Sequence, residues 1–284
     1  MSEQSTPDRR VVGHIAITAL SDGHLDLACQ MLPKSETGEV RRLQEEAGHT
    51  PGDTVRCGLN AFLIESGGKR LLVDSGGGGM APTVGGLGER MTAAGIDPAT
   101  IDTVFLTHMH PDHVGGLGKD GAATFPNAEL VVSAADWDFW TSAENLAAAP
   151  EGAKRFFQVA QASVQPYEGR VRRFTGEEEL LPGVTTLPLP GHTPGHTGLT
   201  LASGGETLLL WGDIVHASVV QFAHPDWGVA FDFDTDLAAA TRKRLFDQVA
   251  TDRQMVAGMH LASGFGHVER AGNAYAFVPA ERQA

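Results

Sequence analysis

Residues 107–113 read T-H-M-H-P-D-H and directly follow the apolar run V-F-L at 104–106. Three imidazoles and one carboxylate within six residues form a dense set of ligands suited to Zn²⁺ and related ions. These candidates are His108, His110, Asp112 and His113. Histidines two apart in extended backbone point to the same side, so the first two can share one ion. Pro111 favours a turn that enters a helix, which lets the last two reach a neighbouring position.

Further candidate ligands follow the ends of other apolar segments. The run at 184–189 leads into P-G-H-T-P-G-H-T, which contains His192 and His196. T-L-L-L-W-G ends at Asp213, and Q-M-V-A-G-M ends at His260. Because ligands gather at the carboxyl edge of strands in open α/β sheets, we expect these side chains to meet at one edge.

Composition excludes several classes of function. The chain has 284 residues, 42% hydrophobic and 20% charged, which is typical of a globular protein. Its formal net charge of −14 would repel phosphate backbones, so we expect no nucleic-acid partner. No apolar run approaches the ~18 residues of a membrane span, so we expect no membrane partner. The polar N-terminus lacks the apolar region of a secretory signal, which predicts a cytoplasmic location.

The pattern of apolar residues predicts one domain over 11–284 behind a loose tail at 1–10. Alternation over 11–27 predicts two strands joined by a hairpin turn at 21–23 (S-D-G). The polar segment 33–53 is expected to cross the surface as a loop. Helices are predicted at 87–94, 134–141, 150–162 and 236–250. Because strands dominate both halves and helices occur singly, we expect two sheets in the middle with helices outside.

H-x-H-x-D-H, followed by G-H-T-P-G-H, G-D and a late histidine, resembles the metallo-β-lactamase superfamily. Longer stretches, among them T-H-M-H-P-D-H-V-G-G-L, S-A-A-D-W-D-F-W and G-H-V-E-R-A-G-N-A-Y-A-F-V-P, are similar to the methyl parathion hydrolase group within it. The likeness extends from about residue 59 to residue 278. It implies an α/β (α+β) fold, a four-layer αββα sandwich, with a dinuclear metal site.

The resemblance also implies a role for each candidate ligand. One metal ion is expected on His108, His110 and His196, the other on Asp112, His113 and His260, with Asp213 as the bridge. Two divalent ions are expected, most suitably Zn²⁺, with Mn²⁺, Co²⁺ or iron as alternatives. His192 is expected to support a ligand from behind, and Asp74 either to orient a ligand histidine or to stabilise a turn. The other histidines are expected to be solvated or packed: His14, His24, His49, His216, His224 and His267.

The expected activity is hydrolysis of an ester bond (EC 3.1), with a metal-bridging hydroxide as the nucleophile and Asp112 and Asp213 as catalytic carboxylates. A protein of this charge is expected to take a neutral or weakly charged small molecule, either an aryl ester or lactone or an organophosphate triester. The resemblance places Trp140 and Phe157 in the substrate pocket. A third aromatic of that pocket is missing from the glycine-rich segment 76–82, which predicts a wider pocket.

Three alternatives stay open. A non-haem iron redox enzyme can use the same fold and ligand types, although flavodiiron relatives carry a glutamate where this chain has His110. A thioester hydrolase similar to glyoxalase II would use the same metal centre. A non-catalytic zinc protein is disfavoured because structural zinc is usually closed by four ligands rich in cysteine. The expected partner is a small-molecule substrate, and a homodimer is compatible with the sequence.

Overall fold

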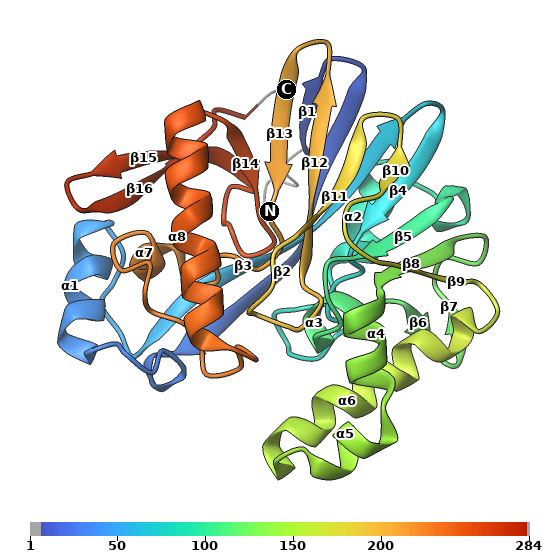
Figure 1. Ribbon diagram of the computed structural model, residues 1–284, viewed down its shortest axis with the longest axis horizontal. Helices are drawn as coiled ribbons and strands as arrows, with labels where there is room; N and C mark the ends of the chain where they lie inside the picture. Colours follow the sequence, from blue (N-terminus) through green and yellow to red (C-terminus); the bar gives the residue numbers. More distant parts are fainter. Residues whose placement is uncertain (1–6, 283–284) are drawn as a thin grey trace.

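A computed structural model describes residues 7–282 and contains two seven-stranded sheets that pack face to face (Figure 1). The first sheet has the order β1 (Asp8–Val12), β2 (Ile15–Ala28), β3 (Thr54–Ser66), β4 (Lys69–Val73), β5 (Thr103–Leu106), β8 (Glu129–Ser133) and β9 (Val171–Phe174). The second sheet has the order β10 (Glu179–Leu181), β11 (Val184–Pro188), β12 (Thr197–Ser203), β13 (Glu206–Leu210), β14 (Met255–Ala257), β15 (Phe265–Ala271) and β16 (Ala274–Pro279).

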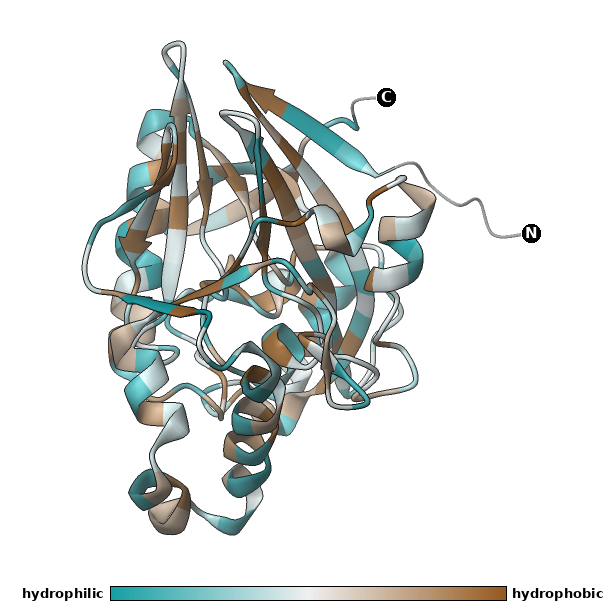
Figure 2. Ribbon diagram, turned by 90° about the vertical axis from the view of Figure 1, so that its right-hand side faces the viewer, coloured by the Kyte–Doolittle hydropathy of each residue, from teal (hydrophilic) through white to brown (hydrophobic). Residues whose placement is uncertain are grey.

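Helices cover the outer sides of both sheets. They are α1 (Thr37–Glu46), α2 (Leu87–Ala93), α3 (Pro111–Val114), α4 (Ala134–Thr141), α5 (Ala143–Ala148), α6 (Glu151–Val164), α7 (Ser218–Gln221) and α8 (Thr235–Asp252). A small hairpin of β6 (Gly118–Lys119) and β7 (Ala122–Ala123) follows α3. Helices α5 and α6 extend beyond the lower edge of the sheets in Figures 1 and 2. Within the described residues, no helix combines the length and apolarity needed to cross a membrane.

Strand alternation explains the four layers. Phe62 and Ile64 of β3 pack between the sheets, in the same core cluster as Leu208 of β13. Leu63, between them, faces the other way and joins the cluster that includes α2 and α6. Leu209 of β13 likewise joins the cluster under α8. Both faces of the central strands are therefore buried, and each sheet needs a helix layer outside. The brown stretches of these strands in Figure 2 mark their apolar residues.

The parallel strands direct their carboxyl ends to one edge of the sandwich. In the first sheet β4, β5 and β8 are parallel, with Val73 beside Phe105. In the second sheet β13 and β14 are parallel, with Leu210 beside Ala257. The loops that follow these strands contain most of the candidate ligands, so the topology brings them together.

The N-terminal third differs from its sequence-based prediction in three places. The hairpin turn lies at 13–14, between β1 and β2, and residues 21–23 form an irregularity inside the long strand β2. Asp22 accepts backbone N–H bonds from Gly77 and Leu87, so it holds two other loops instead of making a turn. Residues 8–10 of the expected tail belong to β1, and residues 1–6 lie outside the described part. The expected loop at 33–53 contains α1, which buries Val40 and other side chains.

Candidate metal centre

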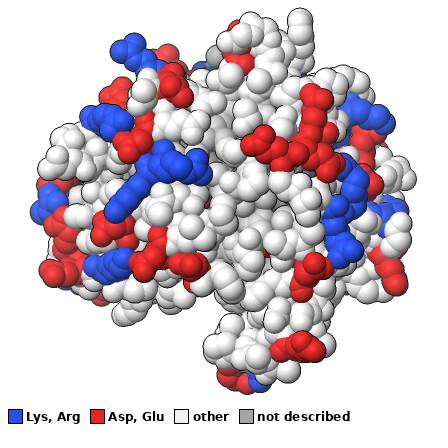
Figure 3. Space-filling view, viewed as in Figure 1, with Lys and Arg blue, Asp and Glu red and all other residues white. Residues whose placement is uncertain are grey.

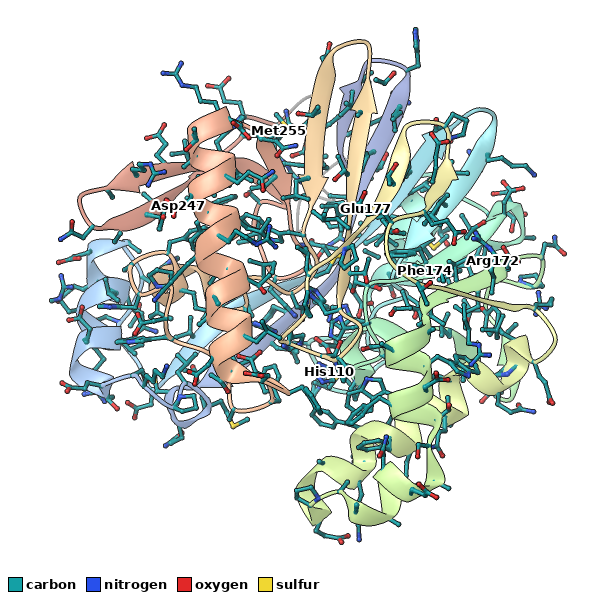
Figure 4. All side chains as sticks on the ribbon, viewed as in Figure 1. His110, Arg172, Phe174, Glu177, Asp247 and Met255 are labelled. Atoms are coloured by element: carbon teal, nitrogen blue, oxygen red, sulfur yellow. The ribbon has the colours of Figure 1, made fainter. Side chains whose placement is uncertain are left out.

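Two groups of metal-ligating side chains lie beside each other at the edge where the parallel strands end. His108, His110 and His192 form one group, Asp112, His113, Asp213 and His260 form the other, and a third combination of His192, Asp213 and His216 overlaps both. The ligand atoms of each group lie within 4.8 Å of one another. Figure 4 shows His110 at the lower end of the sheets, next to α4.

Asp213 lies between the two groups. Its Oδ2 is 2.9 Å from His260 Nε2 and 3.2 Å from His113 Nε2. The same oxygen is 3.7 Å from His108 Nε2 and 3.6 Å from His192 Nε2. One carboxylate therefore reaches imidazoles of both groups, which is the arrangement that a bridging ligand requires.

Hydrogen bonds behind the cluster hold one ring nitrogen of each of four histidines. The pairs are His113 Nδ1 with Asp74 Oδ2 at 2.7 Å, His192 Nδ1 with Asp232 Oδ1 at 2.7 Å, His260 Nδ1 with the Gly58 carbonyl at 2.8 Å, and His108 Nδ1 with Thr107 Oγ1 at 3.0 Å. A bond at Nδ1 leaves Nε2 free to bind a metal, as in carboxylate–histidine–metal arrangements. All four Nε2 atoms accordingly face the cluster.

Unpartnered buried atoms test whether a cation fits. His113 Nε2 and Asp213 Oδ1 are buried and have no hydrogen-bond partner. Leaving such atoms unsatisfied costs free energy, whereas a divalent ion would satisfy a nitrogen lone pair and a carboxylate oxygen together. The residues present therefore fit a metal centre.

Ionisation differs across the cluster. Burial alone would lower the pKa of His113 and of His260, but Asp213 raises it above the ordinary value, so an ion bound there would displace a proton from each. Burial lowers the pKa of His108 and of His110 well below its ordinary value, so both imidazoles are neutral and offer a lone pair. Burial would raise the pKa of Asp213, but the neighbouring His113 and His260 hold it well below the ordinary value. The central carboxylate is therefore ionised.

The structure reverses the expected places of His192 and His196. His196 has both ring nitrogens engaged, because Nδ1 bonds the Leu189 carbonyl at 2.8 Å and Nε2 accepts the Asp213 backbone N–H at 2.9 Å. His192 Nε2 instead lies 3.0 Å from His110 Nδ1, inside the first group. The prediction of His196 as a ligand was wrong in geometry, since no lone pair remains for an ion.

His216 was expected to be solvated or packed, and it is packed, but it lies among the candidate metal ligands instead of apart from them. Its Nε2 lies 3.1 Å from Asp213 Oδ2, and its ring stacks on His260 at 5.0 Å. Neither ring nitrogen has a hydrogen-bond partner, and burial lowers its pKa to about 4. Gln221 fixes its backbone by accepting the His216 N–H. The only sequence feature that could have indicated a place for His216 in the site is its spacing of three residues from Asp213.

Two other buried carboxylates hold the ligand loops. Asp74 has a φ of +60°, an uncommon conformation that places its carboxylate on the Thr107 N–H as well as on His113. Asp136 of α4 accepts the Met109 N–H at 2.9 Å and the Gly195 N–H at 2.7 Å. It thereby ties the loop after β5 to the loop after β11, a role that the sequence did not reveal.

Two cavities open beside the cluster. The smaller, of about 200 Å³, is lined by Asp112, His216 and His260 among others, and the larger, of about 660 Å³, by the predicted pair Trp140 and Phe157. Four further phenylalanines line the larger cavity: Phe139, Phe156, Phe231 and Phe233. Aromatic side chains from other segments therefore line this cavity, and the glycine-rich segment supplies none of its lining.

Neither cavity has Lys or Arg among the described residues that line it. The face drawn in Figure 3 has basic side chains on its flanks, interspersed with acidic ones, and no continuous basic stripe. An uncharged ligand therefore suits the larger cavity better than an anion does.

Comparison with known proteins gives a consistent result. The family model described as Metallo-beta-lactamase superfamily matches residues 54–260. An N-acyl homoserine lactonase of Bacillus sp. is 27% identical over 164 residues, which cover 57% of this chain and 56% of that protein. The N-acyl homoserine lactonase AttM of Azorhizobium caulinodans is 30% identical over 128 residues, or 42% of this chain and 44% of that protein. The chain thus matches about half the length of these curated relatives.

Two solved structures match over their whole length. The crystal structure of the hydrolase AbOPH, of the beta lactamase superfamily, has a TM-score of 0.93 at 29% identity and covers 100% of both chains. AidC, a dizinc quorum-quenching lactonase in complex with the product N-hexanoyl-L-homoserine, has a TM-score of 0.90 at 27% identity, again with 100% coverage of both.

Proposed function

This chain belongs to the metallo-β-lactamase superfamily, and we propose that it is a dinuclear metal-dependent hydrolase that opens lactones or cleaves aryl carboxylic esters. One observation carries the proposal: two groups of ligands share Asp213 and adjoin an aromatic cavity that has no Lys or Arg among its described lining residues. The likeness to lactonases supports the substrate class.

We assign the ligands from the geometry. His108, His110 and His192 would hold one ion, Asp112, His113 and His260 the other, and Asp213 would bridge them. When bound, such ions lower the pKa of water from 15.7 to about 7 and polarise the carbonyl under attack.

Asp112 is the carboxylate of the cluster that lines the smaller cavity, with 15% of its side chain exposed. Burial raises its pKa, but His113 and His260 outweigh that effect and keep it ionised. Its Oδ2 lies 3.4 Å from His113 Nε2 and 3.5 Å from His260 Nε2, and we propose that this carboxylate accepts a proton during hydrolysis.

The larger cavity determines which esters fit. Trp140 and Phe157 lie 4.6 Å apart between ring centroids, and Phe139 adds an edge-to-face contact with Trp140 at 5.1 Å. Aromatic walls of this kind bind a flat ring or an apolar chain, and aromatic contacts are worth about 0.5–1.5 kcal/mol beyond burial. A lactone with an apolar substituent or an aryl ester would fill it.

The test combines metal content with a substrate panel. We expect elemental analysis to give two ions per chain. We also expect turnover of an alkyl-substituted γ-lactone and of an aryl acetate; chelation should abolish this turnover and Zn²⁺ should restore it. An aryl phosphotriester and a glutathione thioester, assayed in parallel, test the other substrate classes. Metal-independent turnover, or one ion per chain at saturation with Asp213→Asn fully active, would refute the assignment.

A further inference from the structure

The segment 229–234 contacts both the metal-ligand cluster and the aromatic cavity. Phe231, Asp232 and Phe233 all line the larger cavity, and they follow a turn in which the Asp232 N–H donates to the Val229 carbonyl at 3.0 Å. The Asp232 carboxylate is directed to His192. Phe231 lies 5.8 Å from the His192 ring and 5.3 Å from the His216 ring between centroids. Phe233 packs on Phe139 at 5.2 Å.

Asp232 is fully engaged beneath this segment. Its side chain is 0% exposed. Oδ1 accepts from His192 Nδ1 at 2.7 Å, and Oδ2 accepts the Val229 N–H at 2.9 Å. A Cβ on Gly228 would lie 2.7 Å from Asp232 Oδ2, so the chain approaches the carboxylate as closely as only glycine permits.

Backbone hydrogen bonds fasten the same segment to the ligand loop. The Phe233 N–H donates to the His192 carbonyl at 3.0 Å, and the Asp234 N–H donates to the Gly191 carbonyl at 2.9 Å. Residues 232–234 therefore hold the imidazole and carbonyl of His192 and the carbonyl of Gly191. Asp232 and Phe233 also line the larger cavity. A displacement of this wall would move the imidazole with it.

We propose that Asp232 is a positioning residue for His192, and that segment 229–234 couples occupancy of the aromatic cavity to metal binding at the His108, His110 and His192 group. The proposal rests on the metal-dependent function above. The carboxylate fixes the tautomer that leaves Nε2 free and sets the ring orientation. A ligand that holds Phe231 and Phe233 in these positions also favours this position of Asp232, so cavity ligand and metal raise each other's affinity by the same factor.

The first test compares Asp232→Ala and Asp232→Asn with the matched variant Asp234→Asn. Asp234 is two residues further on, where its Oδ1 accepts the Leu237 N–H at the start of α8, and asparagine caps a helix equally well. Metal affinity is measured by competition with a chelator, and the visible spectrum of the Co²⁺ form reports the ligand geometry.

We expect Asp232→Ala to weaken one of the two ions 10- to 100-fold and to change the Co²⁺ spectrum of that ion alone. Asp232→Asn should recover part of the affinity, because its amide oxygen still accepts from Nδ1, and it serves in place of the alanine variant if that one does not fold. Asp234→Asn should match the unaltered protein. Equal affinities in all three variants, or equal losses in all three, would overturn the positioning role.

The second test addresses the coupling, with 4-phenylbutanamide as an uncharged probe that has no ester bond. We expect the probe to raise Zn²⁺ affinity in the unaltered protein and to have a smaller effect in Phe233→Ala, a side chain that is 60% exposed and therefore expendable for folding. The same Zn²⁺ affinity with and without bound probe would overturn the coupling. Both tests measure binding and not catalysis. Absence of ester turnover would therefore refute the proposed function, whereas the roles of Asp232 and of segment 229–234 would still be decided by the metal affinities.

Discussion

At the residue scale, the site depends on which nitrogen of each imidazole is already bonded. His192 and His196 are four apart in one loop, both are buried, and both have Nδ1 in a hydrogen bond. They differ at Nε2, which faces His110 in the first case and accepts a backbone N–H from Asp213 in the second. Residue type and spacing carry no information about that second bond.

This difference gives a prediction. We expect His192→Ala to lose one ion per chain at saturating metal, because its Nε2 has no substitute in the first group. His196→Ala should keep two ions and lower the melting temperature instead, since the buried Asp213 N–H loses its acceptor at a cost of about 1–3 kcal/mol. Elemental analysis and thermal unfolding of both variants check it, and loss of an ion in His196→Ala alone would restore the sequence-based choice.

At the element scale, α4 serves the metal centre and the cavity together. Asp136 on one side of this helix holds the two ligand loops, and Trp140, one turn later, forms the cavity wall. Helix α6 completes the wall with Phe157. The boundaries of α4 agree with the predicted 134–141, because an apolar and aromatic run directly follows a buried strand. The residues that this helix packs against could be identified only from the tertiary structure.

Trp140→Ala tests the cavity at this scale. We expect KM for aryl esters to rise by up to tenfold, the equivalent of the ~0.5–1.5 kcal/mol of an aromatic contact, with little change for small aliphatic lactones. Metal content should stay at that of the unaltered protein, which serves as the control for helix integrity. Equal losses of activity on both substrate classes would show that the Trp140 ring, which is 5% exposed, contributes only to core packing.

At the scale of the whole molecule, the cluster joins the two sheets. His108, His110 and His113 follow β5 of the first sheet, whereas Asp213 and His260 follow β13 and β14 of the second. Ions held between them would cross-link the two halves of the sandwich at its lower edge. Asn60 of β3 adds a direct link, since its amide donates to the Met259 and Leu261 carbonyls.

Metal removal should therefore destabilise the entire fold. An ion present at about 1,000 times its Kd stabilises the native state by about 4.1 kcal/mol. At roughly 2–4 °C per kcal/mol for a chain of this order of size, chelation should lower the melting temperature by roughly 10 °C. Thermal unfolding with and without chelator measures the shift, and Asp213→Asn should show a smaller one. An unchanged melting temperature in the unaltered protein would contradict a metal centre between the sheets.

Much of the architecture follows from the sequence alone. Continuous apolar runs such as those at 71–73 and 104–106 indicate strands buried on both faces, which require helices outside the sheets, and histidines and aspartates at the strand ends indicate an edge where they meet. The metallo-β-lactamase motif and the apolar runs at 104–106 and 184–189 agree with the structure because these signals are local, whereas β9, β10 and β12 were not predicted. The N-terminal strands were less predictable, since S-D-G at 21–23 has turn composition but is held inside β2 by pairing with β3 and by the contacts of Asp22.

Tertiary structure alone decided which side chains complete the site. His216 and Asp232 reach the cluster through loops whose course is set by Gln221, by Arg242 and by the packing of α8 on the second sheet. The choice between His192 and His196 depended on a single backbone N–H from another loop. A sequence specifies the chemical groups, but the free lone pair and its direction arise only when hydrogen bonds from distant segments have occupied the remaining atoms.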